Sequence, residues 1–289
     1  MNSNPLFSLL AQNPVRTPNE FRRVLRDKIQ KICLLGLWRS GFFEHAAFYG
    51  GTALRMLYGL DRFSEDLDFS LLAPKPEFRL SAYLDSVQRE LQAWSIEAEV
   101  NLKQKQSSQI ESAFIKANTL KILFGLKVPA LDPDLFHRDE LISVKFELDL
   151  LPPCAFETES KFLLEPMPFN VSSMGLPDLF AGKMHAVLAR SWKNRVKGRD
   201  WYDLIWFVQQ AVPLKLGHLE ARLKQSGHLS PELFLDHVLF QSMLADRINN
   251  VNFEQAKADV LPFIPNPDSL TGWSGELFTE ISSQIIVSV

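Results

Sequence analysis

The chain has 289 residues, of which 46% are hydrophobic and 22% charged, and this composition is typical of soluble globular proteins and excludes extensive disorder. The formal net charge of −3 argues against a protein that coats nucleic acid through bulk charge, although it is compatible with a local basic patch. The two cysteines, Cys33 and Cys154, lie far apart without metal-ligand spacing, so we interpret both as buried thiols of a reducing compartment. The sequence shows neither an apolar run long enough for a membrane span nor a signal-peptide pattern at its start, so we expect a cytoplasmic protein.

The first clear element is a helix that begins after a loose arm of residues 1–16. Thr17 is suited to the N-cap, Pro18 to the first helical position, and Glu20 completes a capping box. A helical apolar stripe then continues to about Arg39. Apolar periodicity predicts the following further elements in chain order: strand 46–49, helix 52–58, strand 66–70, helix 77–94, and strands 96–102, 114–126, 141–151 and 160–172.

The pattern changes near residue 173. From Pro177 onward the signals are helical, over residues 178–190, 200–210, 216–225, 231–249, 253–261 and 269–285. A mixed α/β half followed by a helical half predicts an α+β protein with domains 1–173 and 174–289.

The most informative stretch is FYGGTALRMLYGLDRFSEDLDFSL, residues 48–71. Gly50, Gly51 and Thr52 would place backbone N–H groups close to a phosphate at the start of a short helix. Asp66 and Asp68 alternate with Leu67 and Phe69, so both carboxylates would project from one strand face and favour a cation such as Mg²⁺. Each motif alone is compatible with an ordinary turn or a solvated strand face, but together they favour nucleotide handling.

A third carboxylate is suggested by the strand LISVKFELDLL, in which Lys145, Glu147 and Asp149 share one face. A neighbouring-strand carboxylate often completes a two-metal site for nucleotidyl transfer. We favour Glu147, leave Asp149 as the alternative, and note that a solvent face with compensating charges explains the pattern equally well.

A basic block occupies residues 183–199, with Lys183, Arg190 and Arg199 among its six cations and no acid between them. Asp200 and Asp203 follow at the start of the next helix, where acids also suit the helix dipole. We interpret the block as a grip on a triphosphate or on RNA phosphates, with Asp200 orienting Lys183 or assisting proton removal. The alternative is a solvated basic loop beside an acidic helix start.

The stretches GGTALRMLYGLDRFSEDLDF and KMHAVLARSWKNRVKGRDWYDL resemble two motifs of the AbiEii/AbiGii nucleotidyltransferase toxin family, a branch of the DNA polymerase β-like nucleotidyltransferase superfamily. The resemblance implies a nucleotidyltransferase-fold mixed sheet with flanking helices, followed by a C-terminal helical domain. One departure is Thr52, which replaces the serine of the wider signature. The predicted catalytic set is Asp66, Asp68, Glu147, Lys183 and Asp200, with metal on Asp66, Asp68 and Glu147. The predicted nucleotide-binding set is Gly50, Gly51, Thr52, Ser64, Lys183, Arg190 and Arg199.

The resemblance also implies a function. Members of the family act as toxins in toxin–antitoxin and phage-abortive systems, and similar MenT-like members transfer nucleotides from NTP to the 3′ end of tRNA. We therefore expect a nucleotidyltransferase that uses Mg²⁺ or Mn²⁺ and an NTP substrate, with the 3′ end of an RNA (tRNA) as acceptor and a separately encoded antitoxin as partner. The alternatives are transfer to a protein or small-molecule hydroxyl, and a non-catalytic NTP-binding protein.

Overall fold

The computed structural model describes residues 4–11, 15–103, 110–126, 131–153, 155–190 and 196–288. The chain divides into two compact units, and we describe each by itself. The first unit comprises residues 1–53, 65–152 and 160–173, and the second comprises residues 54–64, 153–159 and 174–289. The two predicted domains, 1–173 and 174–289, stay a prediction. Two short segments before residue 173, residues 54–64 and 153–159, belong to the second unit.

The first unit is built around a mixed sheet with helices on one face. Its elements are α1 (Pro5–Ala11), α2 (Pro18–Arg39), η1 (Phe42–Glu44), β1 (Ala46–Tyr49), β2 (Leu67–Leu71), α4 (Ser81–Ala93), β3 (Ala98–Lys103), β4 (Ile110–Asn118), α5 (Thr119–Leu126), η2 (Pro133–Leu135) and β5 (Leu141–Asp149). Three elements cross the boundary between the units: α3 (Gly50–Tyr58), β6 (Thr158–Leu163) and β7 (Phe169–Met174).

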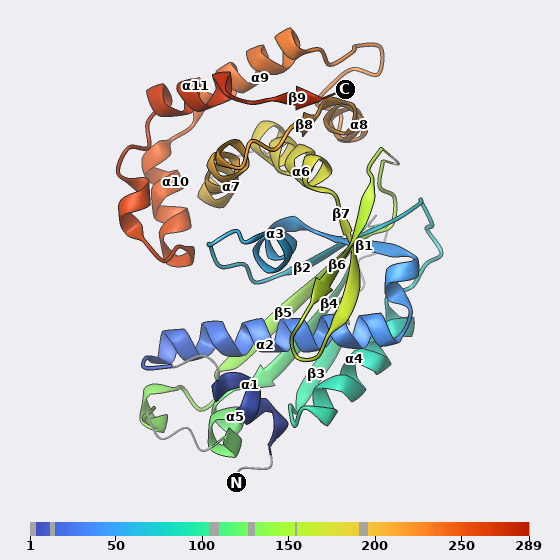
Figure 1. Cartoon of the computed structure of the whole chain (residues 1–289), viewed down its shortest axis with the longest axis vertical. Helices are drawn as coiled ribbons and strands as arrows, with labels where there is room; N and C mark the ends of the chain where they lie inside the picture. Colours follow the sequence, from blue (N-terminus) through green and yellow to red (C-terminus); the bar gives the residue numbers. More distant parts are fainter. Residues whose placement is uncertain are drawn as a thin grey trace. The chain divides into compact units, whose positions relative to one another are not determined.

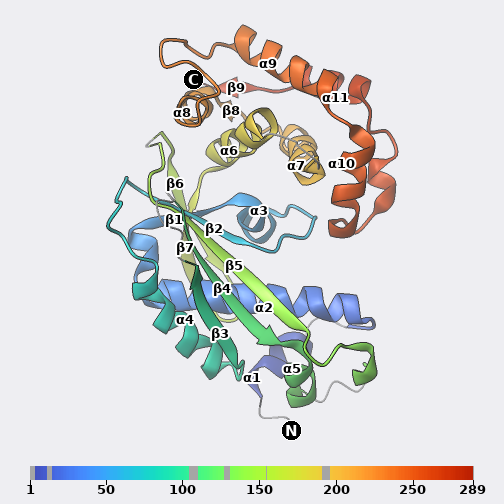
Figure 2. The same cartoon turned by 180° about the vertical axis from the view of Figure 1, so that it is seen from behind.

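The strand order in this sheet is β3-β4-β5-β2-β1-β7-β6. The central strand β2 runs antiparallel to β1 and parallel to β5, while β5 runs antiparallel to β4. Figures 1 and 2 show α2 and α4 along one face of the sheet, with β3, β4 and β5 in front of them in the second view. The strands therefore bury one face against helices, which explains their alternating pattern of residues.

The long helix α2 begins as the sequence predicted. The N-H of Glu20 donates to Oγ1 of Thr17, and the N-H of Thr17 donates to the Glu20 carboxylate, so the predicted capping box is confirmed. Further along, a Cβ atom at Gly36 would lie 2.7 Å from Cα of Val87. Glycine is needed here because α2 and α4 approach each other at backbone distance.

Aromatic side chains fill the core between this sheet and its helices. Phe69 on β2 lies at the centre, with its ring centroid 5.0 Å from that of Phe42, 5.5 Å from Phe48 and 6.0 Å from Phe146. All four side chains are buried. This packing fixes the alternation of β2 and so determines which way Asp68 faces.

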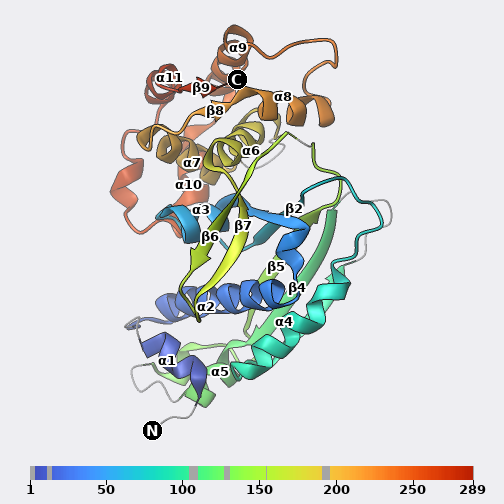
Figure 3. The same cartoon turned by 45° about the vertical axis from the view of Figure 1, so that its right-hand side comes forward.

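The second unit is mostly helical. Its elements are α6 (Leu176–Ala189), α7 (Gly198–Gln209), β8 (Leu214–Lys215), α8 (Leu216–Gln225), α9 (His237–Asn250), α10 (Phe253–Val260), η3 (Leu261–Phe263), η4 (Pro267–Leu270), α11 (Gly275–Ser283) and β9 (Val287–Ser288). Figure 3 shows α6 packed between α7 and α8. The rings of Phe180 and Phe207 stack at 4.4 Å where α6 meets α7.

Gly198 fixes where α7 begins. A Cβ atom at this position would lie 1.8 Å from the carbonyl oxygen of Ala256 on α10. Only glycine allows this approach, so the glycine break in the basic block has a structural cause, and it sets the position of the residues that follow it on α7.

Several sequence predictions are wrong in detail. Residues 5–11 form α1 rather than a loose arm, and the predicted strand 114–126 ends at Asn118 and continues as α5. The single strand predicted over 160–172 is two strands, β6 and β7. The helical half also contains a small parallel sheet, β8–β9, and its helix α9 begins at His237 instead of residue 231. In the described part of the chain, no helix is long and apolar enough to cross a membrane.

Candidate active site

The carboxylate of Asp68 lies against the first residue of α3. Gly50 has a φ of +82°, a left-handed conformation that side chains rarely adopt. A Cβ atom there would lie 2.2 Å from Oδ2 of Asp68. Gly50 is therefore needed both for its backbone conformation and for the space that Asp68 occupies. The positive end of the α3 dipole favours an anion at this place.

The register of the sheet places Glu147 beside Asp68. Asp68 on β2 pairs with Glu147 on the parallel strand β5, and directly paired residues project from the same face. Asp149 pairs instead with Ser70, and its Oδ1 accepts a hydrogen bond of 3.0 Å from the N-H of Leu151. Of the two candidates for the neighbouring carboxylate, Glu147 is thus the one that the register brings next to Asp68.

Glu147 is held by a cation from its own strand. Lys145 Nζ forms an ion pair with Oε1 of Glu147, and both side chains are 32% exposed. The donor chemistry of Asp68 and Glu147 suits a hard divalent cation, which prefers carboxylate oxygens. In the ranges that the structure describes, no three His, Cys, Asp or Glu side chains are arranged to hold a metal. The metal set Asp66, Asp68 and Glu147 therefore stays a prediction.

Thr52 positions the aspartate segment rather than facing outward. Its side chain is fully buried, and its hydroxyl donates a hydrogen bond of 2.5 Å to the carbonyl oxygen of Asp66. This contact differs from the predicted one with a phosphate. Strand β2 begins at Leu67, so Asp66 lies just before the strand, and Ser64 is buried nearby in the chain.

The second unit contains a buried ion-pair network around Asp203 on α7. Arg62 donates from Nε and Nη2 to the two carboxylate oxygens at 2.5 and 2.7 Å, and Lys183 Nζ lies 2.8 Å from Oδ2. Asp203 and Arg62 are 0% and 2% exposed. Burial raises the pKa of Asp203, but the charges of Arg62 and Lys183 outweigh this effect and hold the pKa below its usual value.

This geometry differs from the first of the two roles suggested for Asp200, the orientation of Lys183, while the second, assistance in proton removal, stays a prediction. Asp203, and not Asp200, contacts Lys183 and fixes its position on α6. Asp200 instead pairs with Arg190, whose Nε lies 3.3 Å from its Oδ2. Arg62 was not among the candidate residues, since it lies 141 positions from Asp203 and no local pattern links the two.

Cations gather around the start of α7. Burial lowers the pKa of Lys197, and the positive charges of Arg190 and Arg199 lower it further. The guanidinium of Arg199 also lies 4.0 Å from the ring centroid of Phe263. Two members of the basic block, Lys193 and Arg195, lie outside the described residues. The repulsion between Lys197 and its neighbours Arg190 and Arg199 favours binding of a polyanion, because an anion would relieve the repulsion.

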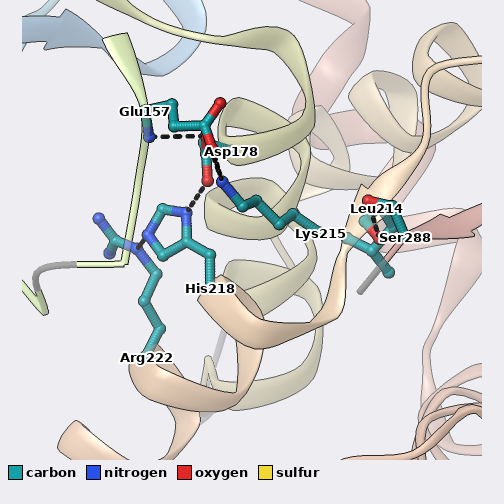
Figure 4. A network of polar contacts seen from close by, with 7 residues as sticks. All are labelled: Glu157, Asp178, Leu214, Lys215, His218, Arg222 and Ser288. Carbon is teal, nitrogen blue, oxygen red and sulfur yellow. Dashed lines mark hydrogen bonds and ion pairs between the residues drawn. The ribbon is translucent and has the colours of Figure 1, made fainter.

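A second network holds the start of α6, the helix that carries Lys183 (Figure 4). Asp178 accepts a hydrogen bond of 2.9 Å from the N-H of Glu157 and contacts Nδ1 of His218 at 3.0 Å. Arg222 donates to Nε2 of His218, so the ring carries its proton on Nδ1 and is neutral. Burial lowers the pKa of His218.

The comparisons with known proteins agree with the sequence motifs. Residues 32–274 match the model of the family described as nucleotidyl transferase AbiEii toxin, type IV TA system. The chain belongs to the AbiEii family. It is accordingly a nucleotidyltransferase of the type IV toxin–antitoxin class, and the family implies an NTP substrate and an antitoxin partner.

Two solved structures resemble this AbiEii chain. One, from H. pylori, is described as a candidate nucleotidyltransferase; it has 16% identity and a TM-score of 0.49, over 90% of this chain and 93% of its own. The other, JHP933 from Helicobacter pylori, has 17% identity and a TM-score of 0.45, over 91% and 88%. At these values the likeness carries no conclusion of its own. No curated protein sequence matches the chain.

Proposed function

We propose that the protein transfers a nucleoside monophosphate from an NTP to the 3′ hydroxyl of an RNA, with tRNA as the acceptor. The observation that carries this proposal is the pairing of Asp68 with Glu147 on one sheet face, with Asp68 against the start of α3. Two adjacent carboxylates beside a helix N-terminus suit a site that handles a divalent cation and phosphates together.

Asp68 and Glu147, with Asp66 just before the strand, are the residues that would hold Mg²⁺ or Mn²⁺. When bound there, a divalent cation supplies charge that stabilises the attacking and leaving oxygens of an in-line displacement. Gly50 supports this assignment, since it leaves the space into which the Asp68 carboxylate projects.

The remaining chemistry is that of the chain's own residues. The acceptor hydroxyl forms a bond to the α-phosphorus, the bond to the bridging oxygen breaks, and pyrophosphate leaves. Glu147 or Asp68 accepts the proton of the acceptor hydroxyl. Lys183, Arg190, Lys197 and Arg199 of the second unit are assigned to phosphate binding, supported by the cationic crowding that lowers the pKa of Lys197. We assign Asp203 and Arg62 to the positioning of Lys183.

The test is a transfer assay with each of the four α-³²P-labelled NTPs, incubated in parallel with tRNA and with tRNA-free cell protein. We expect label on the tRNA 3′ end with Mg²⁺ or Mn²⁺, and none from the Asp66→Ala/Asp68→Ala variant. Circular dichroism of that variant checks that its fold is retained.

The other outcomes discriminate between functions. Label on protein alone would replace the RNA acceptor with a protein hydroxyl and keep the reaction type. NTP binding without release of pyrophosphate, with every acceptor, would contradict the proposed RNA transfer and favour a binding protein.

A further inference from the structure

The sheet of the first unit has a second, polar face that carries no helix of this unit within the described residues. On β4, Ala113, Ile115 and Ala117 are buried, while Ser112, Phe114 and Lys116 between them are only half-buried. The same alternation holds on β5. Figure 2 shows β3, β4 and β5 from this side, in front of α2 and α4. We call this surface the polar sheet face, and define it by Lys103, Ser112, Phe114, Lys116, Ser143 and Lys145.

The polar sheet face is continuous with the carboxylate pair. Glu147 is paired with Asp68 on one side and with Ser112 on the other, and Ser112 is paired with Lys103 on β3. These residues form one row across four strands. With adjacent strands about 4.8 Å apart, the row extends roughly 14 Å from Asp68 to Lys103.

The chemistry of this face is an aromatic ring surrounded by lysines. Phe114 pairs across the strands with Lys145, and Nζ of Lys103 lies 6.0 Å from the centroid of the Phe114 ring. Lys116 is the next residue of β4 on the same face. An aromatic ring among cations is the usual platform for single-stranded nucleic acid, in which a base stacks on the ring and lysines contact phosphates.

The charges also favour a polyanion. Outside the carboxylate pair, the three lysines share the face with one acid on these rows, Glu99, which pairs with Lys116. Lys145 is already ion-paired with Glu147, so Lys103 and Lys116 are the cations of this face that phosphates would meet. Lys103 on the edge strand β3 would also discourage pairing with a strand of another molecule, but that role does not need an aromatic ring on the neighbouring strand.

We propose that the polar sheet face binds the nucleotides next to the 3′ end of a single-stranded RNA acceptor. Phe114 stacks on a base, and Lys103 and Lys116 contact the phosphates. RNA bound along the row from Lys103 to Asp68 then has its terminal 3′ hydroxyl at the carboxylate pair. The inference rests on the proposed function, for which it names the acceptor surface.

The test measures binding of a fluorescein-labelled ten-nucleotide RNA with a free 3′ hydroxyl, by anisotropy over a range of salt concentrations. Lys103→Gln/Lys116→Gln should raise Kd about tenfold or more at low salt and reduce the salt slope by about 1.4, the value for two lost phosphate contacts on a single strand. Phe114→Ala should raise Kd about tenfold without changing the slope, because stacking is not ionic.

The matched control is Lys75→Gln/Lys121→Gln, which removes the same charge from two exposed lysines of the first unit outside this face. It should bind within about twofold of the wild-type protein. Unchanged binding in the face variants, an equal loss in the control, or a wild-type protein that does not bind the RNA would each overturn the inference.

The transfer assay on the same variants separates this inference from the proposed function. We expect a raised KM for RNA with an unchanged KM for NTP. Wild-type transfer to RNA with the same RNA KM in all variants would overturn only the binding surface. Face-dependent RNA binding without transfer of any nucleotide would overturn the proposed function and leave the binding surface standing.

Discussion

Arg62 and Asp203 form a bidentate ion pair that is almost fully withdrawn from solvent, with Nε and Nη2 of the arginine 2.5 and 2.7 Å from the two carboxylate oxygens. Removal of one partner leaves the other charge buried without compensation, which typically costs about 3–5 kcal/mol. We predict this loss for Asp203→Ala, measured by urea unfolding. The double variant Arg62→Met/Asp203→Leu should recover part of it, because the buried guanidinium is removed together with its partner, while Lys183 still loses its carboxylate.

The matched comparison is Asp200→Ala. Asp200 is 8% exposed, but its partner Arg190 is 39% exposed and keeps its contact with water when the carboxylate is removed, so we expect a loss of about 1 kcal/mol. A loss of stability as large as that of Asp203→Ala would contradict the distinction that we draw between the two aspartates of α7.

The buried hydroxyl of Thr52 provides a second prediction. Thr52→Val keeps the shape but removes the hydrogen bond to the Asp66 carbonyl oxygen, at a cost of about 1 kcal/mol. Because the contact positions Asp66, we expect a lower kcat and a higher Mg²⁺ requirement, with little change in the KM for NTP. Thr52→Ser should retain activity. A rise in the NTP KM alone would instead support the phosphate contact that the sequence suggested.

The glycine that faces Asp68 can be tested against a close match. Gly50 and Gly59 both have a φ of +82°, but a Cβ atom meets Asp68 at Gly50 and nothing within 4 Å at Gly59. Both alanine variants carry backbone strain of about 1–2 kcal/mol. Only Gly50→Ala should abolish nucleotidyl transfer, since only it displaces the carboxylate. Equal activity in the two variants would show that the position of Asp68 is not critical.

Stability should depend on pH through His185 on α6. Burial lowers the pKa of His185 to about 4, and the charge of Arg222 contributes to this shift. The unfolded chain therefore takes up a proton near its ordinary pKa of about 6.5 while the folded protein does not, so stability falls as the pH decreases from about 6.5 to 4.

The measurement is urea unfolding at pH 7.5 and pH 5. The wild-type protein should lose more stability between these values than His185→Gln. The control His237→Gln alters an exposed histidine and should keep the wild-type difference. A pH dependence that is the same in all three proteins would refute the role of His185.

Elements with a strong local signal were predictable from the sequence. Helix α2 follows from the Thr17–Glu20 capping box, and β5 follows from strict alternation of apolar and polar residues. The strand prediction was wrong for TLKILFGL, residues 119–126, because a short apolar run is compatible with a strand and with a buried helix equally well. Here the chain turns into α5 after β4 ends at Asn118.

In the candidate site too, local patterns were predictable from the sequence and tertiary contacts were not. Strand alternation predicted that Asp68 and Glu147 each project from one sheet face, and the register of β2 and β5 places them side by side. The partner of Lys183 was assigned wrongly, since Asp200 and Asp203 both suit the start of a helix and only tertiary packing selects Asp203. Arg62 could not be found from periodicity, because its partner Asp203 lies 141 positions away in the chain.

The most direct test of the Asp68–Glu147 site is the rate of nucleotidyl transfer by Glu147→Gln and Asp149→Asn, measured with labelled NTP and tRNA at saturating Mg²⁺. The register pairs Glu147 with Asp68, and it pairs Asp149 with Ser70. Loss of a metal-holding carboxylate removes several kcal/mol of transition-state stabilisation. We predict a decrease of about a hundredfold or more for Glu147→Gln and a rate within about threefold of wild type for Asp149→Asn. A full rate in Glu147→Gln, or a greater loss in Asp149→Asn, would contradict the site that we describe.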